Sequence, residues 1–205
     1  MEQKETVKRQ RRYARRSVNI PSKAQVEQER SNLKRKKAFR QVLGSTVSVL
    51  LVVASIAVLI ATLFLPVLQI SGSSMEPTLN DEEIVVLLKT TNMKKDELCC
   101  FSYQNKLLIK RVVGLPGDKI NIDVNGNVFV NDELIDEPYV TDKALGECDI
   151  TFPCYVSDNH YFVLGDHRST SIDSRSSVIG LVSEEFIVGK IFFRVWPFKT
   201  ISFVD

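Results

Sequence analysis

The pattern of apolar and polar positions divides the chain into three segments. Residues 1–40 contain few large apolar side chains and many charges, so they cannot bury a core of their own. The next charged residue after Arg40 is Glu76, and the interval between them is largely apolar. From residue 69 onward, short apolar runs alternate with polar, turn-forming residues. We therefore expect a tail over 1–40, a helix over 41–68 and a folded domain over 69–205.

The apolar interval has the length of a membrane span. Val47 to Leu65 comprise 19 residues, which as a helix extend about 28 Å at ~1.5 Å per residue. The hydrocarbon core of a bilayer is roughly 30 Å thick. No polar stripe recurs at helical spacing, which disfavours a buried soluble helix. The run exceeds the roughly 7–15 residues of a signal-peptide core and no A-x-A-like site follows it, so we expect a retained anchor that ends near Pro66.

The third segment predicts a mainly β domain. Asn125-Gly126 lies between two alternating runs and predicts a hairpin. Cys99 and Cys100 lie in another expected strand, where neighbouring side chains point to opposite faces and both thiols fit a buried, apolar role. A short helical turn is expected at 183–187. Runs rich in β-branched and aromatic residues predict strands at 82–88, 107–113, 119–124, 127–131, 160–165 and 190–196.

Charge is distributed unevenly along the chain and predicts its orientation. Residues 1–40 carry 14 Lys and Arg against 4 Asp and Glu, whereas residues 41–205 carry 13 against 21. The positive-inside bias predicts a single-pass protein of the cell membrane, with a cytoplasmic N-terminus and an extracytoplasmic domain. A basic cluster beside a membrane span is explained by topology and by attraction to anionic membrane lipid. We therefore expect no nucleic-acid partner.

The remaining cysteines and the histidines give little indication of a cofactor. Cys148 and Cys154 lie in a loop-like region on the expected outer side, and the sequence leaves open whether they form a disulfide. His160 and His167 are the only histidines, and they form no ligand set of metal-site spacing. We expect no metal and no other cofactor.

Three polar stretches are candidates for chemistry. Ser71, Ser73 and Ser74 follow the apolar helix and also fit an ordinary turn. Lys110 and Arg111 are neighbours in an apolar strand, so one can reach solvent while the other is enclosed. An enclosed lysine favours its neutral form and can act as a general base. The third stretch, 164–175, combines four charged and four hydroxyl residues after a strand, where sites are often built.

Together these stretches resemble the motifs of one known family. "SGSSMEPTL", "IKRVVGLPGDKI" and "GDHRSTSIDSR", in this order after an N-terminal span, resemble the type I signal peptidases, over roughly residues 45–195. Lys110 follows the bacterial pattern, since eukaryotic and archaeal relatives carry His there. Some relatives carry a Ser at the position of Gly72, whose hydroxyl supplements the oxyanion hole, whereas Gly is common in Gram-positive-type members. The resemblance therefore implies that this chain lacks that hydroxyl. His167 and Thr170 stand where relatives often carry Asn, and neither is a position of the catalytic dyad.

The resemblance implies a role for each matching residue. Ser74 is the implied nucleophile, whose N–H also donates to the oxyanion, Lys110 is the implied base, and Ser171 orients its amine. The pairs Arg111–Asp166 and Asp173–Arg175 brace the site. A substrate would bind as an added β-strand. Apolar residues that match the pockets for its small side chains, and that equally fit core packing, are Leu68, Ile70, Met75, Leu79, Leu108 and Ile109.

The sequence thus predicts a membrane-bound serine endopeptidase that removes signal peptides from exported preproteins. Its oligomeric state, and whether it serves one secretion pathway, stay open. One competing hypothesis is a triad of Ser74, His167 and Asp166. Another is a non-catalytic relative in assembly or pilus biogenesis, although such a protein should have lost Ser74 or Lys110. A third, a soluble self-cleaving repressor with a similar dyad, is disfavoured by the membrane span.

Overall fold

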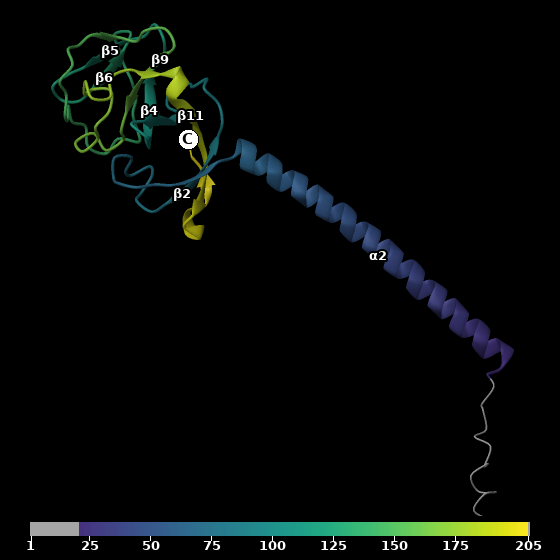
Figure 1. The fold of residues 1–205 in the computed structure, drawn as a ribbon. Helices are drawn as coiled ribbons and strands as arrows, with labels where there is room; N and C mark the ends of the chain where they lie inside the picture. The colour runs from purple at the N-terminus through teal and green to yellow at the C-terminus, as the bar shows by residue number, and fades with distance from the viewer. Residues whose placement is uncertain (1–20, 205) are drawn as a thin grey trace, which may run out of the picture. The chain divides into compact units, whose positions relative to one another are not determined.

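The structure of the protein is a computed structural model, and residues 21–204 are described. The chain divides into two compact units, Met1–Ile56 and Ala57–Asp205, and the division falls within helix α2 (Lys23–Phe64). Figure 1 shows the course of the chain, with the β domain formed entirely by the second unit. Part of the expected basic tail, residues 1–20, lies outside the described residues.

Helix α2 has different limits from the expected 41–68. At its start, the Ser22 N–H donates to Gln25 Oε1 at 2.9 Å, and the Gln25 N–H donates to Ser22 Oγ at 3.3 Å, which is a capping box. The basic cluster at 34–40 is therefore helical. The helix ends at Phe64 because Pro66 cannot continue it and the residues after Pro66 pair with another strand. By length and composition α2 can cross a membrane, and its most apolar window has a mean hydropathy of 2.8.

The β domain consists of two antiparallel sheets. The larger has eight strands in the order β1-β2-β11-β3-β4-β9-β10, with β12 paired to β11, and the smaller has the order β7-β6-β5-β8. Two short 3₁₀ helices accompany them, η1 (Glu184–Phe186) and η2 (Phe198–Thr200). The strands are β1 (Val67–Gln69), β2 (Ile84–Leu88), β3 (Leu98–Tyr103), β4 (Lys106–Gly114), β5 (Lys119–Ile122), β6 (Val128–Val130), β7 (Glu133–Leu134), β8 (Cys154–Tyr155), β9 (His160–Leu164), β10 (Val182–Ser183), β11 (Ile187–Trp196) and β12 (Ser202–Phe203).

The predicted mainly β class is confirmed, and every predicted strand overlaps an observed one. The hairpin at Asn125-Gly126 joins β5 to β6, whose residues pair from Ile120 opposite Val130 to Ile122 opposite Val128. The helical turn expected at 183–187 is η1. The sequence did not reveal β1, β7, β8, β10 and β12, which are only two or three residues long.

Packing on the two faces of β3 confirms the expected alternation. Cys99 packs in one core cluster with Phe101 and Val163, while Cys100 packs in another with Leu79. Burial raises the pKa of each thiol to about 12, so both behave as small apolar side chains. The two remaining cysteines, at 148 and 154, are free thiols in the structure, so the disulfide that the sequence left open is not formed.

Strand β4 carries the geometry that matters for the site. It pairs with β3 along Lys106–Arg111, but with β9 only from Arg111 onward, because β9 ends at Leu164 opposite Arg111. The edge of residues 106–110 that faces away from β3 is therefore not covered by β9.

Candidate active site

One strand and two loops, far apart in sequence, bring one amine and two hydroxyls together. Lys110 Nζ, on β4, donates to Ser74 Oγ at 2.9 Å and to Ser171 Oγ at 2.9 Å. Ser74 lies in the turn after β1, and Ser171 lies in the loop after β9. Only 4% of Lys110 is exposed. The structure thus places the three residues predicted as nucleophile, base and orienting hydroxyl in direct contact.

The surroundings of Lys110 favour its neutral form. Burial lowers the pKa of this lysine from 10.5 to about 8, and the nearby guanidinium of Arg175 acts in the same direction. The carboxylates of Asp173 and Asp166 oppose this shift, but they contact arginines rather than the amine. A buried amine whose hydrogen-bond partners are hydroxyls can accept a proton near neutral pH.

The turn that presents Ser74 depends on two glycines. Gly72 has a φ of +97°, a conformation that favours glycine, and its N–H donates to Asp81 Oδ1 at 2.9 Å. Gly165 is enclosed, since a Cβ there would lie 2.1 Å from Ser171 Oγ and 2.6 Å from the Ser74 carbonyl oxygen. Glycine at 165 is therefore what lets the loop after β9 approach the Ser74 turn.

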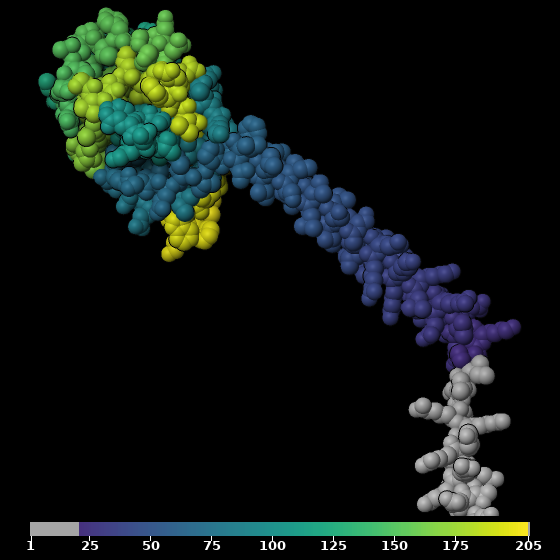
Figure 2. Space-filling model, viewed as in Figure 1, coloured from purple at the N-terminus to yellow at the C-terminus, as the bar shows by residue number. Residues whose placement is uncertain are grey.

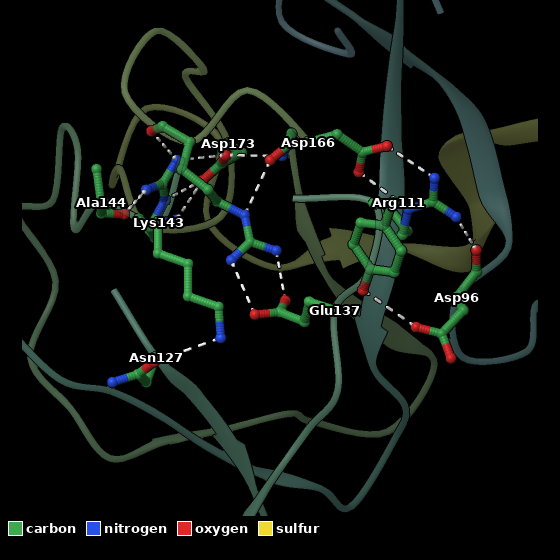
Figure 3. Close-up of polar contacts among 12 residues, drawn as sticks. Asp96, Arg111, Asn127, Glu137, Lys143, Ala144, Asp166 and Asp173 are labelled. Carbon is green, nitrogen blue, oxygen red and sulfur yellow. Dashed lines mark hydrogen bonds and ion pairs between the residues drawn. The ribbon is translucent and has the colours of Figure 1, made fainter. Parts of the chain in front are cut away.

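The pair expected between Arg111 and Asp166 is present and enclosed. Arg111 donates through Nε to Asp166 Oδ1 at 2.9 Å and through Nη2 to Oδ2 at 2.7 Å. Thr78 Oγ1 donates to the same carboxylate at 2.5 Å. Arg111 also donates to the Asp96 carbonyl at 2.6 Å, and the Tyr139 ring stacks 3.9 Å from its guanidinium carbon. Figure 3 shows the contacts of Arg111 with Asp166 and Asp96.

The second expected pair, Asp173–Arg175, anchors the loop after β9. Arg175 donates through Nε and Nη2 to the two carboxylate oxygens of Asp173, each at 2.8 Å. The Gly165 N–H donates to Asp173 Oδ2 at 2.9 Å. Neither member of the pair has any exposed side-chain surface. The pair therefore holds the backbone at Gly165 in place.

One buried pair beside the site was missed by the sequence analysis. Arg168 donates through Nη2 to Glu137 Oε1 at 2.5 Å and through Nη1 to Oε2 at 3.3 Å. Arg168 lies in a stretch already singled out, but Glu137 lies in an irregular segment without a motif. No local pattern distinguishes this glutamate from the exposed acidic residues beside it.

The apolar residues matched to substrate pockets lie in different surroundings. Ile70, Met75 and Leu79 are buried members of one core cluster, and Leu79 has no exposed surface. Leu68 and Ile109 are partly buried and pack against that same cluster. Leu108 packs against the cluster on the opposite face of the sheet, because it alternates with Ile109 along β4.

The geometry does not assemble the competing triad. The backbone N–H of His167 donates to the Ser74 carbonyl at 3.2 Å, and Nδ1 of its imidazole ring lies 3.3 Å from the Ser73 carbonyl oxygen. Both carboxylate oxygens of Asp166 are engaged by Arg111. The imidazole thus contacts the backbone of the turn, while the carboxylate it would need contacts a guanidinium.

Within residues 21–204, no group of three or more His, Cys, Asp or Glu side chains is arranged to hold a metal ion. The arrangement described above is therefore one of hydroxyls, an amine and paired ions. An amine in contact with a serine hydroxyl can withdraw its proton, so this arrangement is suited to activating a serine.

Comparison with known proteins identifies a family for this chain. Residues 43–196 match the family model described as "Signal peptidase, peptidase S26". A signal peptidase I of Bacillus amyloliquefaciens is 32% identical over 163 residues, which cover 74% of this chain and 87% of that protein. A signal peptidase IB of Staphylococcus aureus strain MRSA252 is 37% identical over 155 residues, covering 65% of this chain and 79% of that protein.

Among solved structures, a signal peptidase I from Enterococcus faecalis V583 is 24% identical, with a TM-score of 0.40, and covers 48% of this chain and 96% of that one. The family match includes the apolar C-terminal part of helix α2 and most of the β domain. The chain therefore belongs to the signal peptidase family, peptidase S26, and is a membrane-anchored member of it.

Proposed function

We propose that this enzyme cleaves signal peptides from exported preproteins, with Ser74 as nucleophile and Lys110 as general base. The observation that carries this proposal is the position of Lys110 Nζ, buried and 2.9 Å from the hydroxyls of both Ser74 and Ser171. Retention of both reactive residues argues against a non-catalytic relative.

The reaction follows from these contacts. The neutral amine of Lys110 takes the proton of Ser74 Oγ as this oxygen attacks the scissile carbonyl carbon. The resulting ammonium gives that proton to the leaving amine as the peptide bond breaks, which leaves an acyl-enzyme on Ser74. Water then attacks the ester, Lys110 accepts its proton, and the proton returns to Ser74 Oγ as the signal peptide leaves. Ser171 Oγ keeps the amine directed toward Ser74 throughout.

The backbone N–H of Ser74 is the proposed donor to the oxyanion. Among the described residues, the structure shows no acceptor for this N–H, so it is available to a ligand. Gly72 brings no hydroxyl, but its bond to Asp81 holds the turn in place. A well-placed donor of this kind contributes about 3–4 kcal/mol to transition-state stabilisation.

The uncovered edge of β4 supports binding of an extended peptide. Val112 exchanges hydrogen bonds with the β3 side, since its N–H donates to Glu97 O at 2.9 Å and its carbonyl accepts from Asp96 N–H at 2.8 Å. Because these groups alternate along a strand, those of Leu107 and Ile109 face the uncovered edge. We propose that the substrate adds a strand here, with Ile70, Met75 and Ile109 among the residues near its small side chains.

We propose that the β domain lies on the extracytoplasmic side and also contacts membrane lipid. The basic cluster precedes the apolar run, which favours a cytoplasmic N-terminus. Figure 2 shows the yellow C-terminal segment projecting from the β domain. This segment exposes large apolar side chains, and Trp is favoured at membrane interfaces. Exposed there are Phe192, Trp196, Phe198, Ile201 and Phe203.

The test is cleavage of a model preprotein by the full-length protein in detergent or vesicles, with N-terminal sequencing of the product. We expect Ser74→Ala and Lys110→Met each to lower the rate by at least about 10³-fold, because the two act as a unit. Ser73→Ala and His167→Ala should keep most of the activity. Cleavage that survives Lys110→Met but is lost in His167→Ala would replace the dyad with the triad.

A further inference from the structure

One irregular segment contacts every buried arginine of the site. We call residues 137–145 the strap. Its Glu137 side chain pairs with Arg168, and its Tyr139 ring stacks on Arg111. Its carbonyls at Ala144 and Leu145 accept from Arg175 Nη1 at 3.2 and 2.6 Å. Figure 3 shows Glu137 and Ala144 on the strap among these contacts. The strap is thus attached to the loop after β9 at two points and to β4 at a third.

Glu137 is the only carboxylate that the strap contributes to these contacts. It is 3% exposed, and Arg168 is 1% exposed. A buried guanidinium keeps its charge, so it needs a paired carboxylate or a route to water. The described partners of the Arg168 guanidinium are the Glu137 carboxylate and the Gly165 carbonyl, so Glu137 supplies its counter-charge.

Arg168 transmits this contact to the catalytic backbone. Its Nε donates to the Gly165 carbonyl at 3.1 Å, and its own carbonyl accepts from Arg175 Nη2 at 2.9 Å. Gly165 is packed so closely against Ser171 and the Ser74 carbonyl that no Cβ fits there. A displacement at Gly165 therefore moves the hydroxyl that orients Lys110, the nucleophile turn, or both.

We propose that Glu137 is a positioning residue for the Ser74–Lys110 dyad, acting through Arg168 on the backbone at Gly165. This inference rests on the proposed function. Without the Glu137 charge, the Arg168 cation gains most by turning toward water, which withdraws Nε from the Gly165 carbonyl. A misplacement of about 1 Å in a catalytic group can cost on the order of 10²-fold in rate.

The test is a double-mutant cycle with Glu137→Gln, Arg168→Gln and the double variant, all in the full-length protein. kcat and KM for preprotein cleavage are measured well below each variant's unfolding midpoint, so that only folded enzyme contributes. We expect kcat to fall by about 10- to 100-fold in each single variant, with KM within about threefold. The double variant should match the single ones, because both substitutions break one pathway.

Asp136→Asn is the matched control, since it removes a neighbouring, exposed carboxylate and should leave kcat unchanged. A merely structural role would lower the unfolding midpoint without lowering kcat of the folded enzyme. A folded Glu137→Gln variant with wild-type kcat, or single effects that multiply in the double variant, would overturn the proposal.

If Glu137→Gln does not fold, Glu137→Asp keeps the charge but shortens its reach. It should lower kcat by a smaller factor, and an unchanged kcat would count against the proposal. Ser74→Ala and Lys110→Met, assayed in parallel, distinguish a failure of the proposed dyad from a failure of the proposed role of Glu137. If either of them retains activity, the dyad itself is wrong. If both are inactive while Glu137→Gln is fully active, only the positioning role is wrong.

Discussion

Lys110 and Arg111 are adjacent cations, and the protein buries both in different ways. Alternation along the strand suggested that one of them can reach solvent, which is wrong, since they are 4% and 1% exposed. Arg111 cannot lose its proton, so it is held by the carboxylate of Asp166. Lys110 contacts hydroxyls rather than a carboxylate, and burial lowers its pKa instead. The opposite faces of one strand thus separate an ion-paired guanidinium from the amine that we propose as the base.

The depressed pKa of Lys110 predicts the pH dependence of cleavage. With a pKa of about 8, the amine is mostly protonated below that pH and cannot act as a base. We expect kcat/KM to rise about tenfold per pH unit up to the region of pH 8 and then level off. Measurement of initial cleavage rates from pH 5 to 9 checks this. A flat profile across that range would contradict a lysine base.

The same shift predicts that Lys110 costs stability at neutral pH. Its folded pKa of about 8 lies below the ordinary 10.5, so the folded state binds fewer protons between these values and stability rises with pH there. Lys110→Met should therefore stabilise the inactive protein by about 1–3 kcal/mol at pH 7, and by less at pH 10. Denaturant unfolding of both proteins at the two pH values measures this. If Lys110→Met destabilises the protein equally at both pH values, the hydrogen bonds of Lys110 with the two hydroxyls contribute more to stability than burial of the amine costs.

At the scale of elements, β3 and β4 form the hairpin that carries Lys110. Its two-residue turn places Gln104 and Asn105 at φ of 46° and 63°. Left-handed φ at both central residues is typical of a type I′ turn, for which glycine is favoured at the second position. The sequence analysis identified the Asn125-Gly126 hairpin but not this one, because Gln-Asn is a much weaker turn signal than Asn-Gly.

We expect Asn105→Gly to stabilise the protein by about 0.5–1 kcal/mol, since it relieves the left-handed conformation in an exposed turn. Gly126→Ala is the contrasting variant. Its φ is +79° and a Cβ would lie 2.6 Å from the Ala144 backbone nitrogen, so it should destabilise and disturb the strap. Thermal unfolding with preprotein cleavage measures both effects. A loss of stability in Asn105→Gly would mean that the asparagine side chain stabilises the folded protein by more than its left-handed backbone conformation costs.

The whole molecule combines an apolar helix with a β domain, and we propose that charge determines its orientation in the membrane. Neutralising the basic cluster before the span should weaken the bias that keeps the N-terminus in the cytoplasm. We expect a measurable fraction of molecules to insert with the β domain inside when glutamine replaces Lys34, Arg35, Lys36, Lys37 and Arg40.

Access of an external protease to the β domain in intact cells measures this fraction. Lys89→Gln with Lys94→Gln removes exposed charge from the β domain and serves as the control, which should insert normally. Unchanged orientation after loss of the whole basic cluster would mean that other features of the chain determine its topology.

The sequence alone determined the helices and strands that depend on a local pattern of neighbouring residues. The charge-free interval before Glu76 predicts an apolar helix, and the run rich in β-branched residues at 107–113 predicts a strand whose neighbouring side chains, Lys110 and Arg111, point to opposite faces. The motifs around Ser74, Lys110 and Ser171 indicated the candidate site, and the structure brings these residues together.

Only the tertiary structure decided which side chains are enclosed and what contacts them. Glu137 meets Arg168 across 31 positions, and Thr78 meets Asp166 across 88. Such contacts depend on how sheets and loops pack, so no local pattern distinguishes a buried glutamate from an exposed one. The low pKa of Lys110 has the same origin, because burial is a property of the packed domain rather than of the strand that carries the residue.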